Sequence, residues 1–416
     1  MKDFNIIIQL AWRNIWRNKR RTVLTLTTII IGCAMILFNN ALFHGGTEKM
    51  IDDAVTINAG HLQIHQKGFF ENQTMENAFI PDSGLISTLN ELKDKQMIKD
   101  FSMRVQTDAL ISFNDTTSGA VVQSIDVEKE KQLTTLHSKI LPGGRELNSS
   151  DRKNIIMGDT LAKNLGTGVN SIITLLTQGF DGSICAEKLT IVGLFKSGNP
   201  SYDQRLILMP HAQAVETFAM GDFIHSIIIS INRSSDLNQI MSKLKNVTDA
   251  SSIEILGWRE LIPDIVQFVV IDVSVGYIFA AILFLVVALT VLNTIQMSVF
   301  ERTREFGVML SIGTSPKNVF SIILFESVFI TVIGIAAGLI LGSVICTYFK
   351  YNPIDYSRFA SEFALYGVYT TAYPAKLTAL NVVITAVVIY ASSILFSIIP
   401  ARRASKLNPV DAVRHL

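Results

Sequence analysis

The residues best suited to an interaction chemistry lie in a short charged segment between two long apolar stretches. Glu301 and Glu305 are one helical turn apart, and Arg302 and Arg304 lie between them. Apolar residues occupy other sides of the same segment: Phe306, Met309, Leu310 and Ile312. A helix that carries both ion-pairing and apolar side chains can insert into the groove of a partner protein. The second interpretation is an interfacial helix that only connects the two stretches.

The ends of this segment are also marked in the sequence. Gly313 can end a helix, and Ser315 followed by Pro316 can cap and begin the next one. The segment is too long for a tight turn. We therefore predict a connecting helix over residues 301–315.

Four apolar stretches must position this helix. Each is long enough to cross the hydrocarbon core of a bilayer, which needs about 20 apolar residues. The predicted spans are residues 22–44, 267–300, 317–349 and 377–400. Basic residues cluster before the first span, between the second and third, and after the fourth. Because basic residues near span ends stay in the cytoplasm, we expect both termini inside and the large segment between the first two spans outside.

The segments outside the spans differ in character. Residues 1–21 repeat aromatic and apolar positions every four residues, with Trp12 and Trp16 among them. This pattern predicts an amphipathic helix in the membrane interface, although a simple extension of the first span is the alternative. Residues 350–376 are predicted to be a short extracytoplasmic loop, and residues 401–416 a cytoplasmic tail.

The segment over residues 48–262 is predicted to be a mixed α/β domain outside the membrane. Strand-like stretches include Val55–His65 and Phe101–Phe113, and they alternate with helix-like stretches. The order of elements indicates two lobes. The membrane-proximal lobe is predicted at about 48–115 and 223–262, with an inserted lobe at about 116–222.

Two features inside the third span need an explanation. Glu326 is an acid within an apolar stretch, which is costly unless it finds a partner or reaches the interface. Either it pairs with basic residues at the cytoplasmic face or it extends to the interface. Gly334, Gly338 and Gly342 repeat every four residues and predict a face for close helix packing.

Several kinds of chemistry lack the residues they require. No GxxxxGK[ST] phosphate loop is present, so we expect another chain to hydrolyse any nucleotide. The three cysteines form no metal-binding pattern, and His61 and His65 lack further ligands, so we predict no metal site. The formal net charge of +1 gives no reason to expect a nucleic-acid partner.

Several motifs resemble the signature of FtsX/MacB-type ABC transporter permeases. They are Glu301–Gly307, Ser311–Gly313, Phe325-Glu326, the tail Pro400–Arg414, Ala11–Arg21 before the first span, and Ile156–Gly166 in the outer domain. The resemblance covers essentially the whole chain. It implies a bundle of four membrane helices per subunit, two permease subunits as a homo- or heterodimer, and a two-lobed outer domain. It assigns coupling to a cytoplasmic ATPase, present in two copies, to residues Glu301, Arg302, Arg304, Glu305, Phe306, Gly307 and Gly313.

The resemblance also has consequences for cofactors and substrate. ATP and magnesium would be bound by the partner ATPase and no cofactor by this chain. ATP-driven closure would then move a substrate on the far side of the bacterial inner membrane, without a channel through the bundle. The chain is most similar to the lipoprotein-releasing (LolC/LolE-like) branch, with a MacB-like exporter of peptides or drugs and an FtsX-like activator of a periplasmic partner as alternatives.

The lipoprotein-releasing branch implies further sites and partners. A lipoprotein substrate requires an apolar cavity open to the outer leaflet. Candidate lining residues on the first two spans are Met35, Phe38, Phe43, Tyr277, Phe279 and Phe284. A periplasmic lipoprotein chaperone is a further possible partner. The loop over residues 178–186 lacks the proline and arginine residues expected of a chaperone-recruiting loop.

Overall fold

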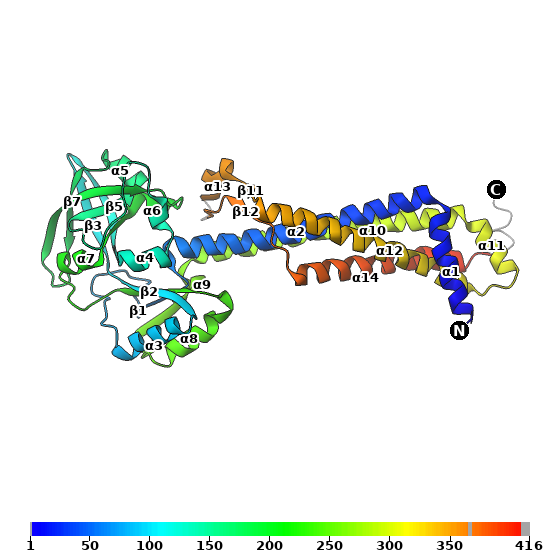
Figure 1. Ribbon diagram of the computed structural model, residues 1–416, viewed down its shortest axis with the longest axis horizontal. Helices are drawn as coiled ribbons and strands as arrows, with labels where there is room; N and C mark the ends of the chain where they lie inside the picture. The colour runs from blue at the N-terminus through cyan, green and yellow to red at the C-terminus, as the bar shows by residue number, and fades with distance from the viewer. Residues whose placement is uncertain (1, 365–367, 409–416) are drawn as a thin grey trace. The chain divides into compact units, whose positions relative to one another are not determined.

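The computed structural model describes residues 2–364 and 368–408. It divides into two compact units (Figure 1). The helical unit comprises residues 1–49, 269–357 and 371–416, and the α/β unit comprises residues 50–268 and 358–370. The fold class predicted from the sequence, four membrane helices with a large mixed α/β domain, is confirmed.

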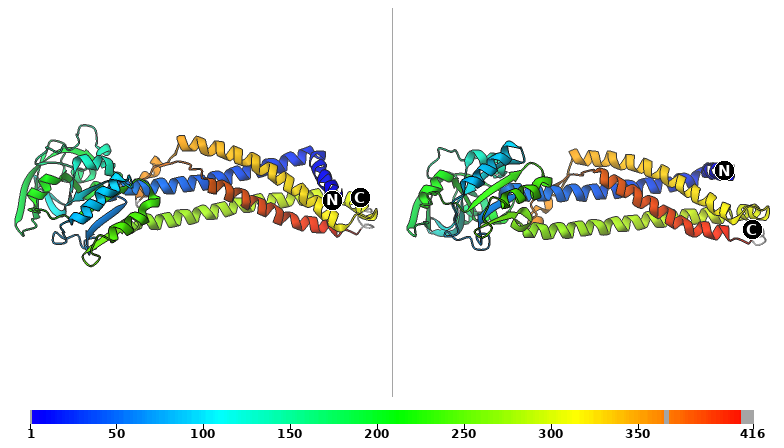
Figure 2. Two further views of the ribbon diagram at one scale, coloured as in Figure 1. Left: turned by 60° about the horizontal axis from the view of Figure 1, so that its bottom comes forward. Right: turned by 90° about the horizontal axis from the view of Figure 1, so that it is seen from below.

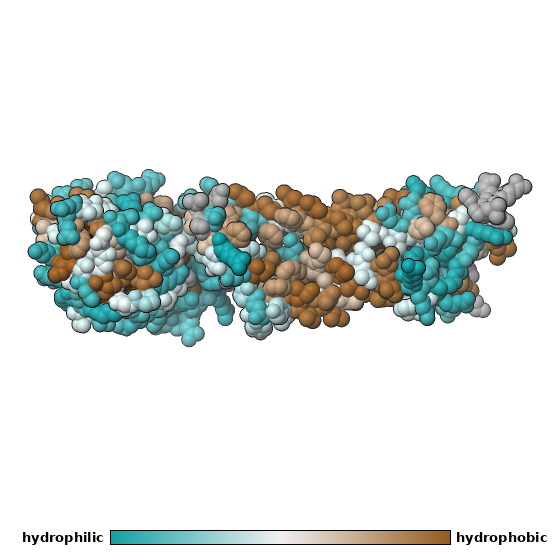
Figure 3. Space-filling view, turned by 90° about the horizontal axis from the view of Figure 1, so that it is seen from above, coloured by the Kyte–Doolittle hydropathy of each residue, from teal (hydrophilic) through white to brown (hydrophobic). Residues whose placement is uncertain are grey.

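Among the described residues, four long helices are apolar enough to cross a membrane, and in the helical unit they run side by side (Figures 1 and 2). The helices of this part of the chain are α1 (Lys2–Arg17), α2 (Lys19–Ala54), α10 (Pro263–Glu301), α11 (Thr303–Ser311), α12 (Pro316–Tyr351) and α14 (Ala379–Ser405). Apolar residues cover much of the bundle surface, as the brown atoms of Figure 3 show. A helix that is apolar on its outer sides is suited to contact with lipid.

Local signals explain where the helices of the connecting region begin and end. Gly313 adopts a φ of 97°, which ends the helix that precedes it. The side chain of Ser315 accepts a hydrogen bond from the backbone N–H of Asn318, and Pro316 occupies the first turn of α12. The connecting helix is therefore α11, which is shorter than the predicted 301–315 because Glu301 still belongs to α10.

A short irregular connection joins α12 to α14. It contains β11 (Ile354–Asp355), η4 (Ser357–Phe359), α13 (Ala360–Ala364) and β12 (Ala372–Tyr373). The two short strands pair antiparallel, with Ile354 opposite Tyr373. Residues 365–367 of this connection lie outside the described residues.

The α/β unit contains a sheet and a closed barrel. The sheet has the order β10-β1-β9-β2 and the barrel the order β3-β4-β8-β5-β7-β6. The strands of the sheet are β1 (Leu62–Gln66), β2 (Ile98–Arg104), β9 (Ser226–Ile231) and β10 (Ile253–Gly257). The strands of the barrel are β3 (Gln106–Phe113), β4 (Thr116–Ile125), β5 (Asn154–Gly158), β6 (Ile172–Gln178), β7 (Ile184–Phe195) and β8 (Leu206–Pro210).

Short helices accompany both lobes of this unit. With the sheet lie α3 (Ser83–Asp94), η3 (Ser234–Asp236), α8 (Leu237–Lys245) and α9 (Trp258–Leu261). α4 (Val127–Leu133) lies against strands β2 and β9 of the sheet, and the barrel is accompanied by η2 (Leu136–Lys139), α5 (Asp159–Leu165), α6 (Pro200–Arg205) and α7 (His211–Thr217). Each lobe has its own apolar core: Leu62, Ile229 and Leu89 belong to that of the sheet, and Ile111 and Leu175 to that of the barrel.

Two local predictions for this unit are wrong. Val55–Ala59 is a π-helix (η1) that continues α2, not the start of a strand, and Gly60 ends it with a φ of 72°. The stretch Phe101–Phe113 is two strands, because β2 pairs with β9 as far as Arg104 while β3 pairs with β4 from Gln106 onward. The barrel therefore begins at about residue 106 rather than 116.

Candidate functional site

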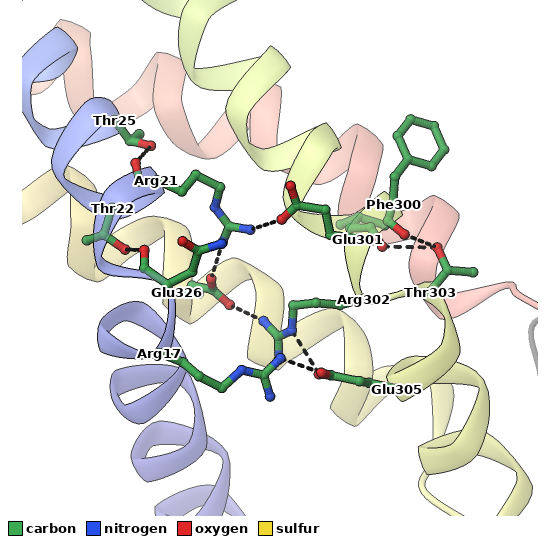
Figure 4. Close-up of polar contacts among 12 residues, drawn as sticks. Arg17, Arg21, Thr22, Thr25, Phe300, Glu301, Arg302, Thr303, Glu305 and Glu326 are labelled. Carbon is green, nitrogen blue, oxygen red and sulfur yellow. Dashed lines mark hydrogen bonds and ion pairs between the residues drawn. The ribbon is translucent and has the colours of Figure 1, made fainter. Parts of the chain in front are cut away.

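Three arginines and three glutamates form one chain of alternating charge at the end of the bundle that carries α1 and α11 (Figure 4). In order, the members are Arg17, Glu305, Arg302, Glu326, Arg21 and Glu301. They come from α1, α2, the last residue of α10, the residue before α11, α11 itself and α12. We refer to these six residues as the charge chain.

Glu326 is the buried centre of the charge chain. Its Oε2 accepts a hydrogen bond from Nη1 of Arg302 at 3.0 Å, and its Oε1 accepts one from Nη2 of Arg21 at 3.3 Å. Glu326 is only 6% exposed and Arg302 9%. A carboxylate in such a place is tolerated when opposite charges bond to it directly. Glu326 is therefore paired inside the protein.

The outer members of the charge chain are more accessible. Glu301 Oε2 accepts from Nη1 of Arg21 at 3.2 Å. Glu305 accepts from Nε of Arg302 at 3.1 Å and also from Arg17. Partial burial would raise the pKa of Glu305, but the hydrogen bonds from Arg17 and Arg302 outweigh it and hold the pKa below its ordinary value. Glu305 is thus held as an anion that links α11 to α1.

The corner between α1 and α2 places the two N-terminal arginines. The helices are separated only at Asn18, and the Thr22 hydroxyl donates to the backbone carbonyl of Ile15 across this corner. Arg17 is thereby the last residue of α1, while Arg21 lies in the first turns of α2. α1 also packs on α12 through Trp12, whose ring centroid lies 5.6 Å from that of Phe329.

Apolar packing fixes α11 against the bundle. Phe306 is 1% exposed and belongs to the same core cluster as Ile15 and Val319. The guanidinium of Arg302 lies over the Phe306 ring, 5.0 Å from its centroid. Gly307 is buried beside Phe306. A displacement of α11 must therefore either break this packing or move the elements that hold it.

The opposite face of α11, together with Ile312 just after its end, is exposed within the part of the chain that the structure describes. Val308 is 44% exposed and Ile312 is 78% exposed, although both are apolar. Arg304 is exposed on the same helix and stands outside the charge chain. Gly313 lies beyond the end of α11 and acts through its backbone conformation. Exposed apolar side chains next to charge are typical of interaction surfaces.

The structure brings together most of the residues that the sequence assigned to coupling. Glu301, Arg302 and Glu305 belong to the same charge chain as Glu326, and Arg302 contacts Glu326 directly. Arg17 and Arg21 were not among the predicted site residues. The available signal was Glu326 itself, since a buried acid requires basic partners and the N-terminal basic cluster offers them.

The three predicted packing glycines lie against α2 of the same chain. A Cβ atom added at Gly338 would lie 2.6 Å from Cys33 Cβ and 2.9 Å from the carbonyl oxygen of Ile30. At Gly334 the nearest atom would be Ile29 Cγ2 at 2.6 Å. At Gly342 the nearest neighbour would be Leu37 Cδ2 at 3.0 Å. Glycine at these positions lets α12 and α2 approach closely.

The six residues predicted to line an apolar cavity differ in exposure and in their neighbours. The side chains of Met35, Tyr277 and Phe279 are exposed on the bundle surface. The other three have interior contacts: Phe38 packs on Phe349, Phe43 on Gly276, and Phe284 on the bundle core. Met35, Tyr277 and Phe279 are thus the most accessible of the six, while Phe38, Phe43 and Phe284 are half-buried.

Taken together, the fold and the site define a multi-pass membrane protein with a large α/β domain inserted between its first two spans. A sequence model of the MacB-like periplasmic core domain matches residues 22–247, and one of the FtsX-like permease C-terminal domain matches residues 277–409. The first match alone covers more than half of the 416 residues. The chain belongs to the FtsX/MacB-type family of ABC transporter permeases, and its α/β unit is the extracytoplasmic domain.

Relatives of this family match nearly the whole chain. The macrolide export ATP-binding/permease protein MacB of Campylobacter fetus is 28% identical over 95% of this chain and 59% of its own length. The uncharacterized ABC transporter permease YknZ of Bacillus subtilis is 22% identical over 98% of both chains. The lipoprotein-releasing system transmembrane protein LolC of Neisseria meningitidis serogroup B is 20% identical over 95% of this chain and 94% of its own.

The chain thus spans only about 59% of the length of the MacB relative, while it matches the other two from end to end. Among solved structures, the periplasmic region of MacB from Actinobacillus actinomycetemcomitans is similar to 52% of this chain over 97% of its own length. The TM-score is 0.36 and the identity 13%.

Proposed function

We propose that this chain is a permease subunit that carries the energy of ATP hydrolysis, performed by a partner subunit, to the extracytoplasmic domain. The observation that carries the proposal is the charge chain, because it ties α11 to α1, α2, α10 and α12 at once. A helix held by one contact could move alone. A helix held by a buried network moves its neighbours with it.

The route begins at the exposed face of α11. In the proposed mechanism Arg304, Val308 and Ile312 contact a cytoplasmic ATP-binding subunit, which binds ATP and magnesium. Motion of α11 then passes through Arg302 to Glu326 and on to Arg21 at the start of α2. Two ATP-binding subunits and a second permease subunit, identical or not, complete the assembly. Both termini lie in the cytoplasm in this arrangement, as the basic flanks predict.

For the substrate, we propose a lipoprotein released from the inner membrane, with a periplasmic chaperone as its acceptor. Support comes from LolC, a lipoprotein-releasing protein that this chain matches from end to end. The second candidate is export of a peptide or drug, supported by the greater identity to MacB, whose name states macrolide export. In both cases the helices α2, α10, α12 and α14 share a packed apolar core, which suits a transmitting bundle better than a channel.

The docking step is tested by Ile312→Asp in a chain purified from its native membrane. Burial of a charge in an apolar contact is costly, so the ATP-binding subunit should no longer co-purify. Ile184→Asp in β7 is the matched control, since Ile184 is 82% exposed and lies in the extracytoplasmic domain. Equal recovery of the ATP-binding subunit with both variants contradicts the proposal.

The substrate is tested separately by native mass spectrometry of the purified complex. Co-purified acylated protein supports lipoprotein release. Recovery of an unacylated peptide or a macrolide instead supports the second candidate. Recovery of only a soluble hydrolase would contradict both and favour an activator of a periplasmic partner.

A further inference from the structure

The outer end of α2 contains two consecutive buried glycines, Gly45 and Gly46, covered by residues 373–376. This segment begins at the end of β12, drawn in orange in Figure 1, and leads into α14. All of these residues belong to the helical unit. Two glycines in the interior of a long helix weaken it relative to alanine, so their presence calls for a local reason.

The reason is a close approach of the covering segment. A Cβ atom at Gly45 would lie 2.1 Å from the carbonyl oxygen of Pro374 and 2.7 Å from the backbone nitrogen of Lys376. A Cβ atom at Gly46 would lie 2.3 Å from Cδ1 of Tyr373. The first contact is with backbone and the second with a side chain. Only glycine at both positions lets the segment lie on α2 in this way.

Polar contacts hold the segment on the helix. The backbone N–H of Lys376 donates to the carbonyl oxygen of Ala41 at 2.8 Å, and the backbone N–H of Ala375 donates to that of Phe349 at 3.3 Å. The Lys376 ammonium also pairs with the carboxylate of Glu48, and both side chains are half exposed. The segment therefore joins α2 to the end of α12.

We propose that Gly45, Gly46 and residues 373–376 form a clamp that holds the outer end of α2, and that this clamp must open when the coupling motion arrives. The inference rests on the proposed function, since it concerns how the motion leaves the bundle. The physical basis is the short range of the contact. Van der Waals attraction at such a close fit is lost over a fraction of an ångström, so the clamp is either closed or open. The clamp would hold the outer end of α2 in place until the ATP-driven displacement is large enough to break this contact.

A reversible cross-link tests whether opening is required. Glu48→Cys with Lys376→Cys, in a chain whose native cysteines are replaced by alanine, places one thiol on each side of the clamp. A short linker that forms a disulfide with each thiol then holds the clamp closed until a reductant is added. The control pair is Glu91→Cys with Lys95→Cys, because this ion pair is similarly exposed but lies at the end of a single helix, α3, in the α/β unit. Both variants are studied in the complex with the ATP-binding subunit, before and after reduction.

The readouts are ATP hydrolysis and the ATP-dependent change in hydrogen exchange of residues 50–268. The linked clamp should lower that change at least about fivefold, the lower end of typical coupling between two sites, and reduction should restore it. ATP hydrolysis should continue. An undiminished change in the linked clamp overturns the proposal. If the unlinked complex shows no ATP-dependent change at all, the proposed function fails and the clamp fails with it.

A second set of variants tests the closed contact itself. Gly45→Ala should raise hydrogen exchange at Lys376, because the clash is with backbone that no side-chain change can relieve. Gly46→Ala should do the same, but Gly46→Ala with Tyr373→Ala should recover protection. Gly119→Ala is the control, since a Cβ there meets nothing within 4 Å. Unchanged exchange at Lys376 in Gly45→Ala contradicts the clamp.

Discussion

Neutralising Glu326 should weaken the junction between α11 and the bundle far more than neutralising the exposed acids of the charge chain. Glu326→Leu removes the carboxylate that accepts from both Arg302 and Arg21. Each arginine keeps one partner, Glu305 and Glu301 respectively. The variant therefore leaves the buried guanidinium of Arg302 and the partly buried guanidinium of Arg21 only partly compensated.

The magnitude follows from burial. A hydrogen bond to a charged group contributes about 1.5–3 kcal/mol, so loss of two would cost about 3–6 kcal/mol if nothing compensated. Removal of one member of a buried ion pair costs about 3–5 kcal/mol. Because the remaining partners compensate in part, we expect about 3–4 kcal/mol for Glu326→Leu. The side chain of Glu301 is 41% exposed, so Glu301→Gln should cost less than about 1 kcal/mol.

The assay is a double-mutant cycle on the purified chain, with Trp258→Phe as background. The remaining tryptophans, Trp12 and Trp16, both lie on α1, so their fluorescence during SDS titration reports the helical unit. The cycle combines Glu326→Leu with Arg302→Met. We expect a coupling energy of about 2 kcal/mol, since the two residues share one buried contact. A coupling energy near zero, or equal losses for Glu326→Leu and Glu301→Gln, would refute the reasoning.

Three further predictions concern other parts of the chain. Gly338→Ala should lower the thermal unfolding midpoint of the purified chain more than Gly342→Ala, because a Cβ would lie 2.6 Å from α2 at the first position and 3.0 Å from it at the second, and equal midpoints would count against this. Arg104→Met should cost about 3–5 kcal/mol in chemical denaturation, whereas Arg104→Met with Glu130→Met should recover most of it, since this pair is buried. Burial lowers the pKa of His65 to about 4. Between about pH 6.5 and 4 the unfolded chain therefore binds a proton at this residue that the folded chain does not. The contribution of His65 to the free energy of unfolding should fall by about 1.4 kcal/mol per pH unit as the pH drops through that range. His65→Gln should reduce the slope by about this amount, while His61, whose pKa burial also lowers to about 4, keeps its own contribution, and an unchanged slope in denaturation curves measured across that range would contradict the assignment.

Much of the fold was predictable because the strongest signals are local. The spans are long apolar stretches, and Gly313 and Ser315 mark the ends of the helices between them. The errors arose where local preference and tertiary context disagree. Val55–Ala59 contains β-branched residues that favour a strand, yet it continues a long helix and buries Val55 and Ile57. At this segment, tertiary packing outweighs the intrinsic preference of the residues for a strand.

The boundary between the two lobes was missed for a different reason. β3 alternates buried and exposed residues over most of its length, whereas β2 buries Asp100, Phe101 and Ser102 in succession and gives no regular period that could mark its end. What changes at Val105 is the partner strand, from β9 to β4. Strand pairing depends on residues far away in sequence, and a period of two cannot reveal it.

Only the acidic members of the charge chain could be predicted from the sequence. The acids stood out, because Glu326 interrupts an apolar stretch and Glu301 and Glu305 repeat at a helical turn. Their partners did not, because the N-terminal cluster contains several basic residues and helix phase decides which of them face the bundle. The break at Asn18 sets that phase, so that Arg17 and Arg21 reach the acids. No local feature of the sequence predicts that the helix breaks at Asn18.

In the proposed mechanism the two ends of α2 respond to displacement in different ways. At the end near Arg21 the contacts are ionic, and Coulomb attraction falls only as the inverse of distance. Such contacts stretch and continue to pull, so motion of α11 is followed smoothly. At Gly45 and Gly46 the contacts are steric and short in range, so they are lost over a small displacement, and the half-exposed Lys376–Glu48 ion pair of the clamp adds little attraction because solvent screens it. A smooth input at one end and an abrupt release at the other would convert gradual movement of the ATP-binding subunits into a single step of the extracytoplasmic domain.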